Sequence, residues 1–292
     1  MTEYKRAAKA ALSFSKPLPD AKLRVISLGA GVQSSVMALM AAKGEVGPMP
    51  DCAIFADTQW EPKEVYTHLD WLETQLPFPV HRVSEGNIRE DIIRIMQMDK
   101  IRGDNGTPPF FAFRDGKRRG PIRRQCTEFY KIRPIRRYFR QALGLKKGQR
   151  GPKEPVVEQW IGISTDEVQR MKMARDKWCA NRWPLIETGM SRNDCLNWFN
   201  KNYPSRRLSK SACIGCPYHS NAAWREVKAN PAQWKDAVEI DRIIRPGSAS
   251  SDSEWFLHTS GVPLDEVDLS TAADKGQQEF GFLEECEGMC GI

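Results

Sequence analysis

The segment VISLGAGVQSSVMAL, residues 25 to 39, decides the fold expected for this chain. Its apolar start is typical of a buried parallel strand, and the run that begins at Ser34 is typical of a helix. Gly29 and Gly31 lie between the two and allow a sharp turn that brings the backbone close to a ligand. Ser34 and Ser35 place hydroxyl and amide groups at a helix N-terminus, where the helix dipole favours an anion. The segment predicts a phosphate-binding turn, with a purely structural strand-to-helix turn as the alternative.

Strand-like and helix-like segments alternate along the first half of the chain. Strands are expected at 23–28, 51–58, 78–84 and 156–164, and helices at 34–43, 62–76, 87–100 and 127–143. This alternation predicts an α/β fold with a mainly parallel, twisted sheet flanked by helices. Ligands bind at the carboxyl ends of the strands in such sheets. The glycine turn, Asp57 and Gly162 all fall at expected strand ends.

The remaining segments are less regular. Residues 101–121 are rich in Gly, Pro and charge and are expected to form a loop. Residues 192–202 and 230–245 have the spacing of amphipathic helices. The chain after Pro246 is polar and is expected to be loosely structured.

Composition narrows the class of protein. The chain has 292 residues, a mean hydropathy of -0.54 and no long apolar run, so no transmembrane helix and no membrane partner are expected. Its start lacks the apolar core of a secretion signal, which favours a cytoplasmic location. In a reducing compartment, the eight cysteines indicate metal or redox chemistry rather than a disulfide framework.

The net charge of +7 is unevenly distributed. Residues 114–150 hold 14 Lys or Arg, and residues 251–292 hold ten Asp or Glu against one Lys. This basic block predicts a polyanion site, and two solvated faces of opposite sign are the alternative. The candidate anion-binding residues, which flank Cys126, are Arg123, Arg124, Lys131 and Arg133. Arginine forks suit phosphate and sulfate, and the same cations suit a nucleic-acid backbone.

Two cysteines form a CxxC turn, Cys213-Ile-Gly-Cys216, which places two thiolates on one side of a tight turn and suits a metal or cluster. Cys126 lies in the basic block, and Cys286 and Cys290 lie at the C-terminus in ECEGMCGI. Two further cysteines, Cys52 and Cys179, are expected to be buried free thiols, the second of them among helix-like charged residues.

Several segments, in order, resemble one superfamily. GAGVQSS resembles the SGGxDS loop of the PP-loop family, which includes ATP pyrophosphatases and PAPS (phosphoadenosine phosphosulfate) reductases. FADTQWEP resembles its second-strand segment, with Asp57 and Thr58 matching. RRQCTEFYKIRPI resembles the CCxxRKVxPL segment of the assimilatory sulfonucleotide reductases, and WIGISTDEVQRMK resembles their TGIRR segment. PLIETGMSRNDCLNWF and SACIGCPYH follow in the same order, so the resemblance covers residues 23 to 220.

The resemblance implies a site for ATP or a PAPS-like adenine nucleotide. The nucleotide-binding residues that it implies are Ser27, Gly29, Ala30, Gly31, Gln33, Ser34, Ser35, Asp57, Thr58, Gly162 and Arg170. Gln33 stands where the family has an acidic residue, and a neutral amide can hydrogen-bond but cannot hold Mg²⁺ as a carboxylate does. Asp57 is therefore the candidate catalytic carboxylate, and the one that would hold Mg²⁺.

The resemblance also implies a [4Fe–4S] cluster. Its expected ligands are Cys126, Cys213, Cys216 and Cys290, with Cys286, Cys195 or an open position for substrate as alternatives to Cys290. Because thiolates alone do not choose between the two metals, structural zinc is the alternative cofactor. The implied organisation is an N-terminal extension at 1–22, a nucleotide-binding α/β domain at 23–190, and a helical, cysteine-containing C-terminal region at 191–292 that closes the cluster site.

Two sulfur chemistries fit this interpretation. In the first, the Cys286 or Cys290 thiolate attacks the sulfur of a sulfonucleotide. In the second, ATP adenylates a substrate oxygen with release of pyrophosphate, and sulfur is then inserted. The acceptor in the second is a nucleic acid bound by residues 114–150, as in tRNA thiolation or DNA phosphorothioation.

The order of the segments favours the reductases as relatives. The single Cys126 and the end ECEGMCGI, where the reductases have ECGLH, favour the second chemistry. A protein that donates sulfur or a thiol and a second copy of the chain in a homodimer are the compatible protein partners. The alternative of another class is a zinc-stabilised nucleic-acid-binding protein without catalysis.

Overall fold

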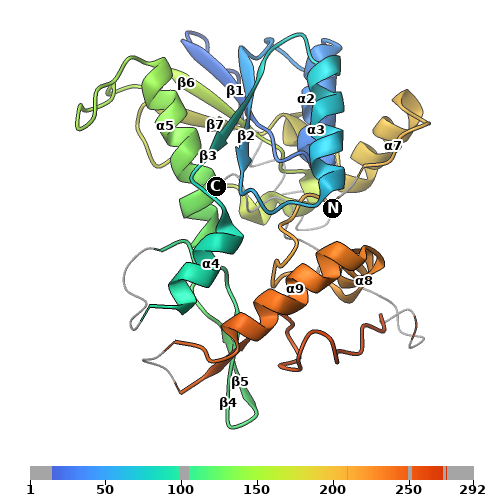
Figure 1. Ribbon diagram of the computed structural model, residues 1–292. Coiled ribbons are helices and arrows are strands. Elements are labelled where there is room, and N and C mark those ends of the chain that lie inside the picture. Colours follow the sequence, from blue (N-terminus) through green and yellow to red (C-terminus); the bar gives the residue numbers. More distant parts are fainter. Residues whose placement is uncertain (1–14, 99–104, 209, 249–251, 272–273, 275–292) are drawn as a thin grey trace.

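The computed structural model describes residues 15–98, 105–208, 210–248, 252–271 and 274. Its centre is a five-stranded parallel sheet (Figure 1). In sheet order the strands are β3 (Val80–Ser84), β2 (Cys52–Asp57), β1 (Leu23–Ser27), β6 (Val157–Ile161) and β7 (Cys179–Arg182). Helices cover both faces, so the predicted α/β class with a mainly parallel sheet is confirmed.

Alternation along the strands assigns each face its own core. Ile26 and Phe55 face α2 (Val32–Ala42), α3 (Lys63–Gln75) and α7 (Arg192–Asn202). Val25 and Ile54, one residue earlier on each strand, face α5 (Arg133–Ala142) on the other side. Because successive side chains of a strand point to opposite faces, the near-continuous apolar strands fill both cores.

The strand order places a crevice beside β1. The chain passes from β1 to β2 on one side and returns to β6 on the other, and both neighbours pair parallel to β1. In open α/β sheets this reversal of direction opens a crevice at the carboxyl ends of the strands. The glycine turn after β1 and Gly162 after β6 meet there.

The helix expected at 127–143 begins with an irregular turn. Thr127–Ile132 (η1) is a π-helix, and α5 follows it directly. π-helical turns are rare and often mark functional sites, because the extra residue displaces the side chains around it. Tyr130 and Phe139 are buried.

Parts of two segments expected to lack regular structure form a second sheet, so the loop prediction was wrong for residues 111–114 and 117–121, and the prediction for the chain after Pro246 was wrong for residues 254–256. Its strands are β5 (Lys117–Pro121), β4 (Phe111–Arg114) and β8 (Glu254–Phe256), all antiparallel. Asp115 and Gly116 join β4 to β5, and both have positive φ (51° and 70°), as a tight hairpin turn requires. Buried Phe111 and Phe256 provide the apolar face that holds the three strands together.

This small sheet belongs to a second lobe below the first in Figure 1. The lobe contains α4 (Ile88–Met96), α8 (Asn221–Ala229) and α9 (Pro231–Ile244), which pack around buried Trp224 and Ile240. Contacts cross the division expected at residue 190, because α7 packs on α2 and β8 pairs with β4. Each lobe is thus built from both parts of the chain.

Cys179 begins the edge strand β7 and does not lie in a helical segment, which corrects that expectation. Cys52 and Cys179 are nevertheless buried free thiols, as predicted. Burial raises the pKa of the Cys179 thiol to about 12. The chain leaves β6 through the 3₁₀ turn Thr165–Arg170 (η2) and continues after β7 into α6 (Pro184–Glu187).

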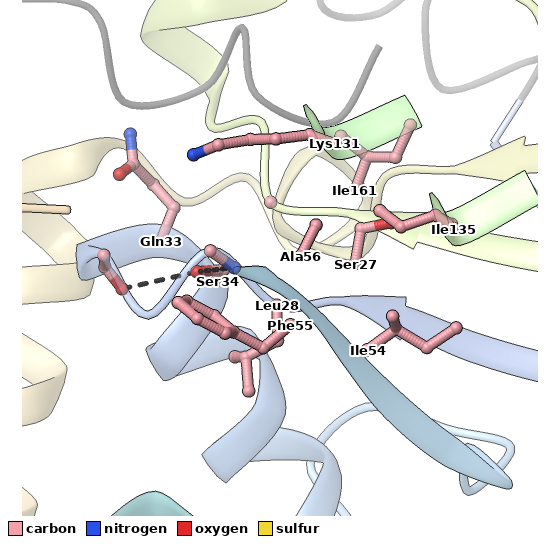
Figure 2. Close-up of a pocket in the computed structure, with 13 residues that line it drawn as sticks. Ser27, Leu28, Gln33, Ser34, Ile54, Phe55, Ala56, Lys131, Ile135 and Ile161 are labelled. Carbon is pink, nitrogen blue, oxygen red and sulfur yellow. Dashed lines mark hydrogen bonds between the residues drawn. The ribbon is translucent and has the colours of Figure 1, made fainter. Parts of the chain in front are cut away.

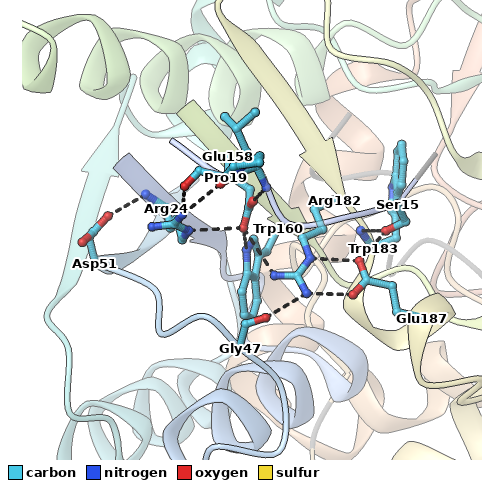
Figure 3. A network of polar contacts seen from close by, with 11 residues as sticks. Ser15, Pro19, Arg24, Gly47, Asp51, Glu158, Trp160, Arg182, Trp183 and Glu187 are labelled. Atoms are coloured by element: carbon cyan, nitrogen blue, oxygen red, sulfur yellow. Dashed lines mark hydrogen bonds and ion pairs between the residues drawn. The ribbon is translucent and has the colours of Figure 1, made fainter. Parts of the chain in front are cut away.

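A buried polar network holds residues 15–22 against β6, β7 and the start of α6 (Figure 3). The Glu158 carboxylate accepts hydrogen bonds from the Leu18 amide and from Trp160 Nε1, the latter at 2.6 Å. Arg182 Nη1 lies 3.4 Å from the same carboxylate, and Arg182 Nη2 pairs with Glu187 at 2.7 Å. These contacts lie away from the glycine turn and have a structural role.

None of the helices in the described ranges combines the length and the apolar composition that crossing a bilayer requires.

Candidate nucleotide and cysteine site

A pocket lies at the carboxyl ends of β1, β2 and β6, beneath η1 and α5 (Figure 2). It is called the glycine-loop pocket here. Its lining residues are Ser27, Leu28, Gly29, Gly31, Gln33, Ser34, Ile54, Phe55, Ala56, Lys131, Ile135, Ile161 and Gly162. Seven residues expected at a nucleotide or anion site therefore meet in one place. The apolar wall from β2 and α5 was not predicted, because apolar residues on a buried strand or helix give no local sign that they line a pocket.

The loop presents backbone amides to the pocket. Gly31 is the N-cap of α2 and supplies no side-chain cap, and the first N–H groups of a helix have no partner within the helix. Ser34 Oγ accepts a hydrogen bond from the Gly29 amide at 3.1 Å and lies 3.5 Å from the Gly31 carbonyl oxygen, to which it donates. The hydroxyl thereby closes the turn. The turn borders the pocket, and no side chain caps the first amides of α2.

Gly162 allows β6 to approach this turn. A Cβ atom on Gly162 would lie 2.9 Å from the Ser34 nitrogen and 3.0 Å from its Cα. Such distances are shorter than ordinary contacts, and the atoms met are backbone, which cannot swing aside. Glycine is thus required at this position by the close approach of two backbone segments.

The Gln33 side chain is held by protein groups. Its Oε1 accepts a hydrogen bond from Arg192 Nη1 at 3.1 Å, and its Nε2 lies 3.4 Å from Ser164 Oγ. The amide thereby ties the start of α2 to the start of α7 and to the loop after β6. An amide suits this position because it can both accept from Arg192 and donate to Ser164.

Other expected nucleotide-binding residues do not line the glycine-loop pocket. Ala30 is buried beneath the turn, with a positive φ of 56°. Ser35 Oγ lies 3.0 Å from His68 Nε2 in the core between α2 and α3. Arg170 pairs with Glu167 within η2, and its side chain is 9% exposed.

Asp57, the expected catalytic carboxylate, ends β2 and supports the following turn. Its Oδ1 accepts hydrogen bonds from the Gln59 amide at 2.7 Å and from Tyr66 Oη at 2.8 Å. Burial, together with the hydrogen bond to Asp57, raises the pKa of the Tyr66 hydroxyl. Asp57 is absent from the lining of the glycine-loop pocket, and Thr58 beside it faces the cysteines.

The cysteine turn, residues 213–216, docks on the loop between β2 and α3. The Ile214 amide donates to the Trp60 carbonyl oxygen at 2.9 Å, and a Cβ on Gly215 would lie 2.2 Å from the Trp60 ring. Thr58 Oγ1 lies 3.2 Å from Cys213 Sγ. The two segments that resembled one family are therefore in direct contact.

Charged groups surround Cys213. Burial and the nearby Glu61 carboxylate raise the pKa of its thiol well above the ordinary value, and Lys131 and Thr58 act in the opposite direction. Cys126 is close enough to contribute to the same increase. Lys131 Nζ lies 3.4 Å from Glu61 Oε1, and the same lysine lines the glycine-loop pocket. Lys131 thus connects the pocket with the cysteine turn.

The expected cluster ligands come together only in part. Cys126, Cys213 and Cys216 lie in the same region, but no three His, Cys, Asp or Glu side chains among the described residues are arranged to hold a metal ion. Cys195 is fully buried in the core beside α2, which argues against it as a ligand, and burial raises its pKa to about 12. Cys286 and Cys290 lie outside the described residues.

His219 braces the cysteine turn. Its Nε2 donates to the Cys213 carbonyl oxygen at 3.0 Å, and its ring packs edge-on against Trp224 with centroids 4.8 Å apart. Burial lowers the pKa of His219 to about 4. A neutral ring that donates to a carbonyl supports the turn.

The four candidate anion-binding residues separate in space. Lys131 lines the glycine-loop pocket, whereas Arg123 is exposed. The Arg124 guanidinium lies over the Tyr218 ring, and that of Arg133 lies over the Phe129 ring.

Glu61, the partner of Lys131, was not predicted from the sequence although it lies in the quoted segment FADTQWEP. Its role depends on a contact 70 residues away in the chain, which the sequence does not reveal.

Comparison of the chain with models of known protein families gave no match, and neither did comparison with curated proteins.

Proposed function

We propose that this chain is a PP-loop enzyme of the PAPS reductase family that binds an adenine nucleotide and carries out sulfur chemistry at its cysteines. The observation that carries the proposal is the position of Lys131. Its ammonium group lines the glycine-loop pocket and pairs with Glu61 beside Cys213. A phosphate bound by Lys131 in the glycine-loop pocket would therefore lie next to the cysteines.

The lining of the pocket carries groups that suit both ends of a nucleotide, and its cavity of about 40 Å³ would have to widen to admit one. Amide groups of the first turn of α2 would receive phosphate oxygens, and Lys131 would offset their charge. Leu28, Ile54 and Ile135 form an apolar wall that suits a purine base. Because Gln33 is a neutral amide engaged with Arg192, any Mg²⁺ would depend on the nucleotide phosphates and on Asp57.

The donor types at the second site fit an iron–sulfur cluster. Cys126, Cys213 and Cys216 would supply soft thiolates, and Lys131 would offset part of their charge. Cys290 or Cys286 is the proposed fourth ligand. When bound, such a cluster supplies iron that changes oxidation state or holds sulfur. Structural zinc on the same thiolates is the alternative, and it would accompany the non-catalytic, nucleic-acid-binding function.

Two reactions are compatible with this site. In sulfonucleotide reduction, a cysteine thiolate attacks the sulfur, the sulfur–oxygen bond to the nucleotide breaks, and a thiol donor protein later releases sulfite. In ATP-dependent sulfur transfer, an acceptor oxygen attacks the α-phosphorus and pyrophosphate leaves, after which sulfur from a donor displaces AMP. In both, the glycine-loop pocket would hold and orient the phosphates.

The proposal is tested by anaerobic purification, followed by measurement of iron, acid-labile sulfide and zinc, and by nucleotide binding. About four irons and about four sulfides per chain are expected, with binding of ATP or a sulfonucleotide. Lys131→Met should weaken nucleotide binding, whereas Lys63→Met, a control at an exposed lysine on α3, should not. Pyrophosphate release from ATP would identify sulfur transfer, and sulfite release would identify reduction. Zinc without sulfide, together with no nucleotide affinity, would overturn the proposal.

A further inference from the structure

The basic block of residues 114–150 divides into two groups. The arginines of α5 are engaged by the protein: Arg136 pairs with Asp176, Arg137 pairs with Glu85, and Arg140 donates to backbone carbonyl oxygens. These cations stabilise the fold. They are therefore poor candidates for binding an external polyanion.

The cations of the β4–β5 hairpin face outward. Lys117, Arg118 and Arg119 are exposed on β5, and Arg123 is exposed just beyond it. Within the described ranges, no carboxylate lies within ion-pair distance of Lys117 or Arg119. The turn of the hairpin extends from the second lobe (Figure 1).

Arginines and aromatic rings follow one another from the hairpin inward. The Arg118 guanidinium carbon lies 5.0 Å from the Phe111 ring centroid, and the Phe111 and Tyr218 centroids are 6.4 Å apart, with the rings at 70°. The Arg124 guanidinium carbon lies 5.6 Å from the Tyr218 centroid. We call these four residues the cation–aromatic ladder.

The inner end of the ladder lies at the cysteines. Tyr218 is two residues after Cys216, and Arg124 is two residues before Cys126. The ladder thus leads from the exposed cations of β5 to both segments that carry the proposed cluster ligands. Tyr218 is half-buried, which leaves part of it accessible to a ligand.

We propose that the β4–β5 hairpin and the cation–aromatic ladder bind a nucleic-acid strand and bring an unpaired nucleotide to the cysteine site. This deepens the proposed function, on which it rests for the role of the cysteines, by making a nucleic acid the sulfur acceptor. Exposed cations beside an accessible aromatic ring are typical of sites that follow a phosphate backbone and stack a base. Tyr218 supplies that ring, whereas Phe111 is buried and positions Arg118. An acidic protein would use the cations but would gain little from the ring.

The first test measures the affinity of the full chain for labelled probes as a function of salt. The probes are a single-stranded DNA of about 20 nucleotides, a duplex of the same sequence, and unmodified tRNA. The hairpin variant is Lys117→Ala/Arg118→Ala/Arg119→Ala. The matched control, Lys146→Ala/Lys147→Ala/Arg150→Ala, removes three exposed cations from the loop after α5.

The hairpin variant should bind the preferred probe at least about tenfold more weakly, and the slope of log K against log[salt] should fall by about 2. The control should change both much less. Preference for tRNA or for single-stranded DNA would identify the kind of strand. Equal effects of the two variants, or the lack of salt-dependent binding to any probe, would overturn the proposal.

The second test concerns stacking. Tyr218→Ala should weaken binding of the single strand by about tenfold and of the duplex much less, because a stacked base is lost only where bases are unpaired. Tyr218→Phe keeps the ring and should bind as the unmodified chain does, which also controls for folding. A Tyr218→Ala variant that binds single strand and duplex with unchanged affinity would overturn the role of the ladder.

These binding assays require neither ATP or a sulfonucleotide nor a bound cluster. Failure of ATP binding with intact nucleic-acid binding would count against the proposed function alone. Normal ATP binding with no nucleic-acid binding would overturn this inference and favour sulfonucleotide reduction.

Discussion

Gly162 shows how strongly a single residue can constrain the candidate site. The loop after β6 passes so close to the N-terminus of α2 that a methyl group would lie 2.9 Å from the Ser34 nitrogen. The resemblance implied nucleotide binding by Gly162, and the structure adds a steric reason for glycine at this position. The amide that a side chain would crowd is one of those proposed to face phosphate.

Gly162→Ala should lower the free energy of unfolding by about 1–3 kcal/mol, because backbone must move to admit the methyl group. Gly29→Ala is the matched control in the same pocket. Its Cβ would lie 3.6 Å from Ser34 Oγ, an ordinary contact, and a change within about 0.5 kcal/mol is expected. Urea unfolding of both variants checks the difference. Equal stabilities would show that the loop after β6 shifts without cost.

At the scale of elements, α2 and α3 are joined through a buried polar pair. Ser35 Oγ on α2 lies 3.0 Å from His68 Nε2 on α3, and His68 is only 5% exposed. Burial, with a smaller effect of Arg206, lowers the pKa of His68 from 6.5 to about 4. The folded chain therefore holds this ring neutral in a range where the unfolded chain protonates it.

This pKa difference predicts how stability changes with pH. Between about pH 6.5 and pH 4 the unfolded state binds the additional proton, so the contribution of His68 is complete above pH 6.5 and is lost as pH falls toward 4. The His68→Gln variant has no ring to titrate, so its free energy of unfolding should fall less steeply between pH 6.5 and pH 4. The difference between the two slopes corresponds to the binding of up to one proton. Urea unfolding from pH 4.5 to 7.5 measures both slopes, and identical slopes would contradict the assignment.

The sequence predicted the elements of the sheet core better than those of the second lobe. Strands β1 and β2 carry apolar runs before turn residues, and β3 (VHRVS) and β6 (VEQWI) carry β-branched or aromatic residues in short segments, so local signals identified all four. The hairpin was missed because Gly, Pro and charge outweighed the short apolar run that ends at Phe113 and the Asp115-Gly116 turn. β7 and β8 are only four and three residues long and are stabilised by partners distant in the chain.

Some features of the candidate site could also be predicted from local sequence, and others could not. The glycine turn and Gly162 could be recognised in the sequence because the backbone geometry there needs particular residues. The pairing of Lys131 with Glu61 and the hydrogen bonds of Gln33 could not be predicted, because they join segments 70 and 159 residues apart. Contacts of this kind depend on how the two lobes and α7 pack, which local patterns do not encode.

At the scale of the whole molecule, the two ends of the parallel sheet have different roles. The carboxyl ends of the strands carry the glycine-loop pocket, whereas the amino-terminal half of β6 carries the buried carboxylate of Glu158 (Figure 3). Around Glu158, the N-terminal segment, β1, β6 and β7 are joined by hydrogen bonds and ion pairs. Its removal would leave Arg24 and Arg182 short of a buried partner.

Glu158→Ala should therefore lower the free energy of unfolding by about 3–5 kcal/mol, as expected when one member of a buried charge network is lost. Glu73→Ala, which breaks the exposed pair with Arg82, should cost less than about 1 kcal/mol. Urea unfolding compares the two variants, and proteolysis near Leu18 should accelerate only in the first. Nucleotide binding by folded Glu158→Ala should persist, because Glu158 precedes Gly162 by four residues, about 13 Å along an extended strand. Loss of nucleotide binding by a fully folded Glu158→Ala variant would show that the two ends of the sheet are coupled.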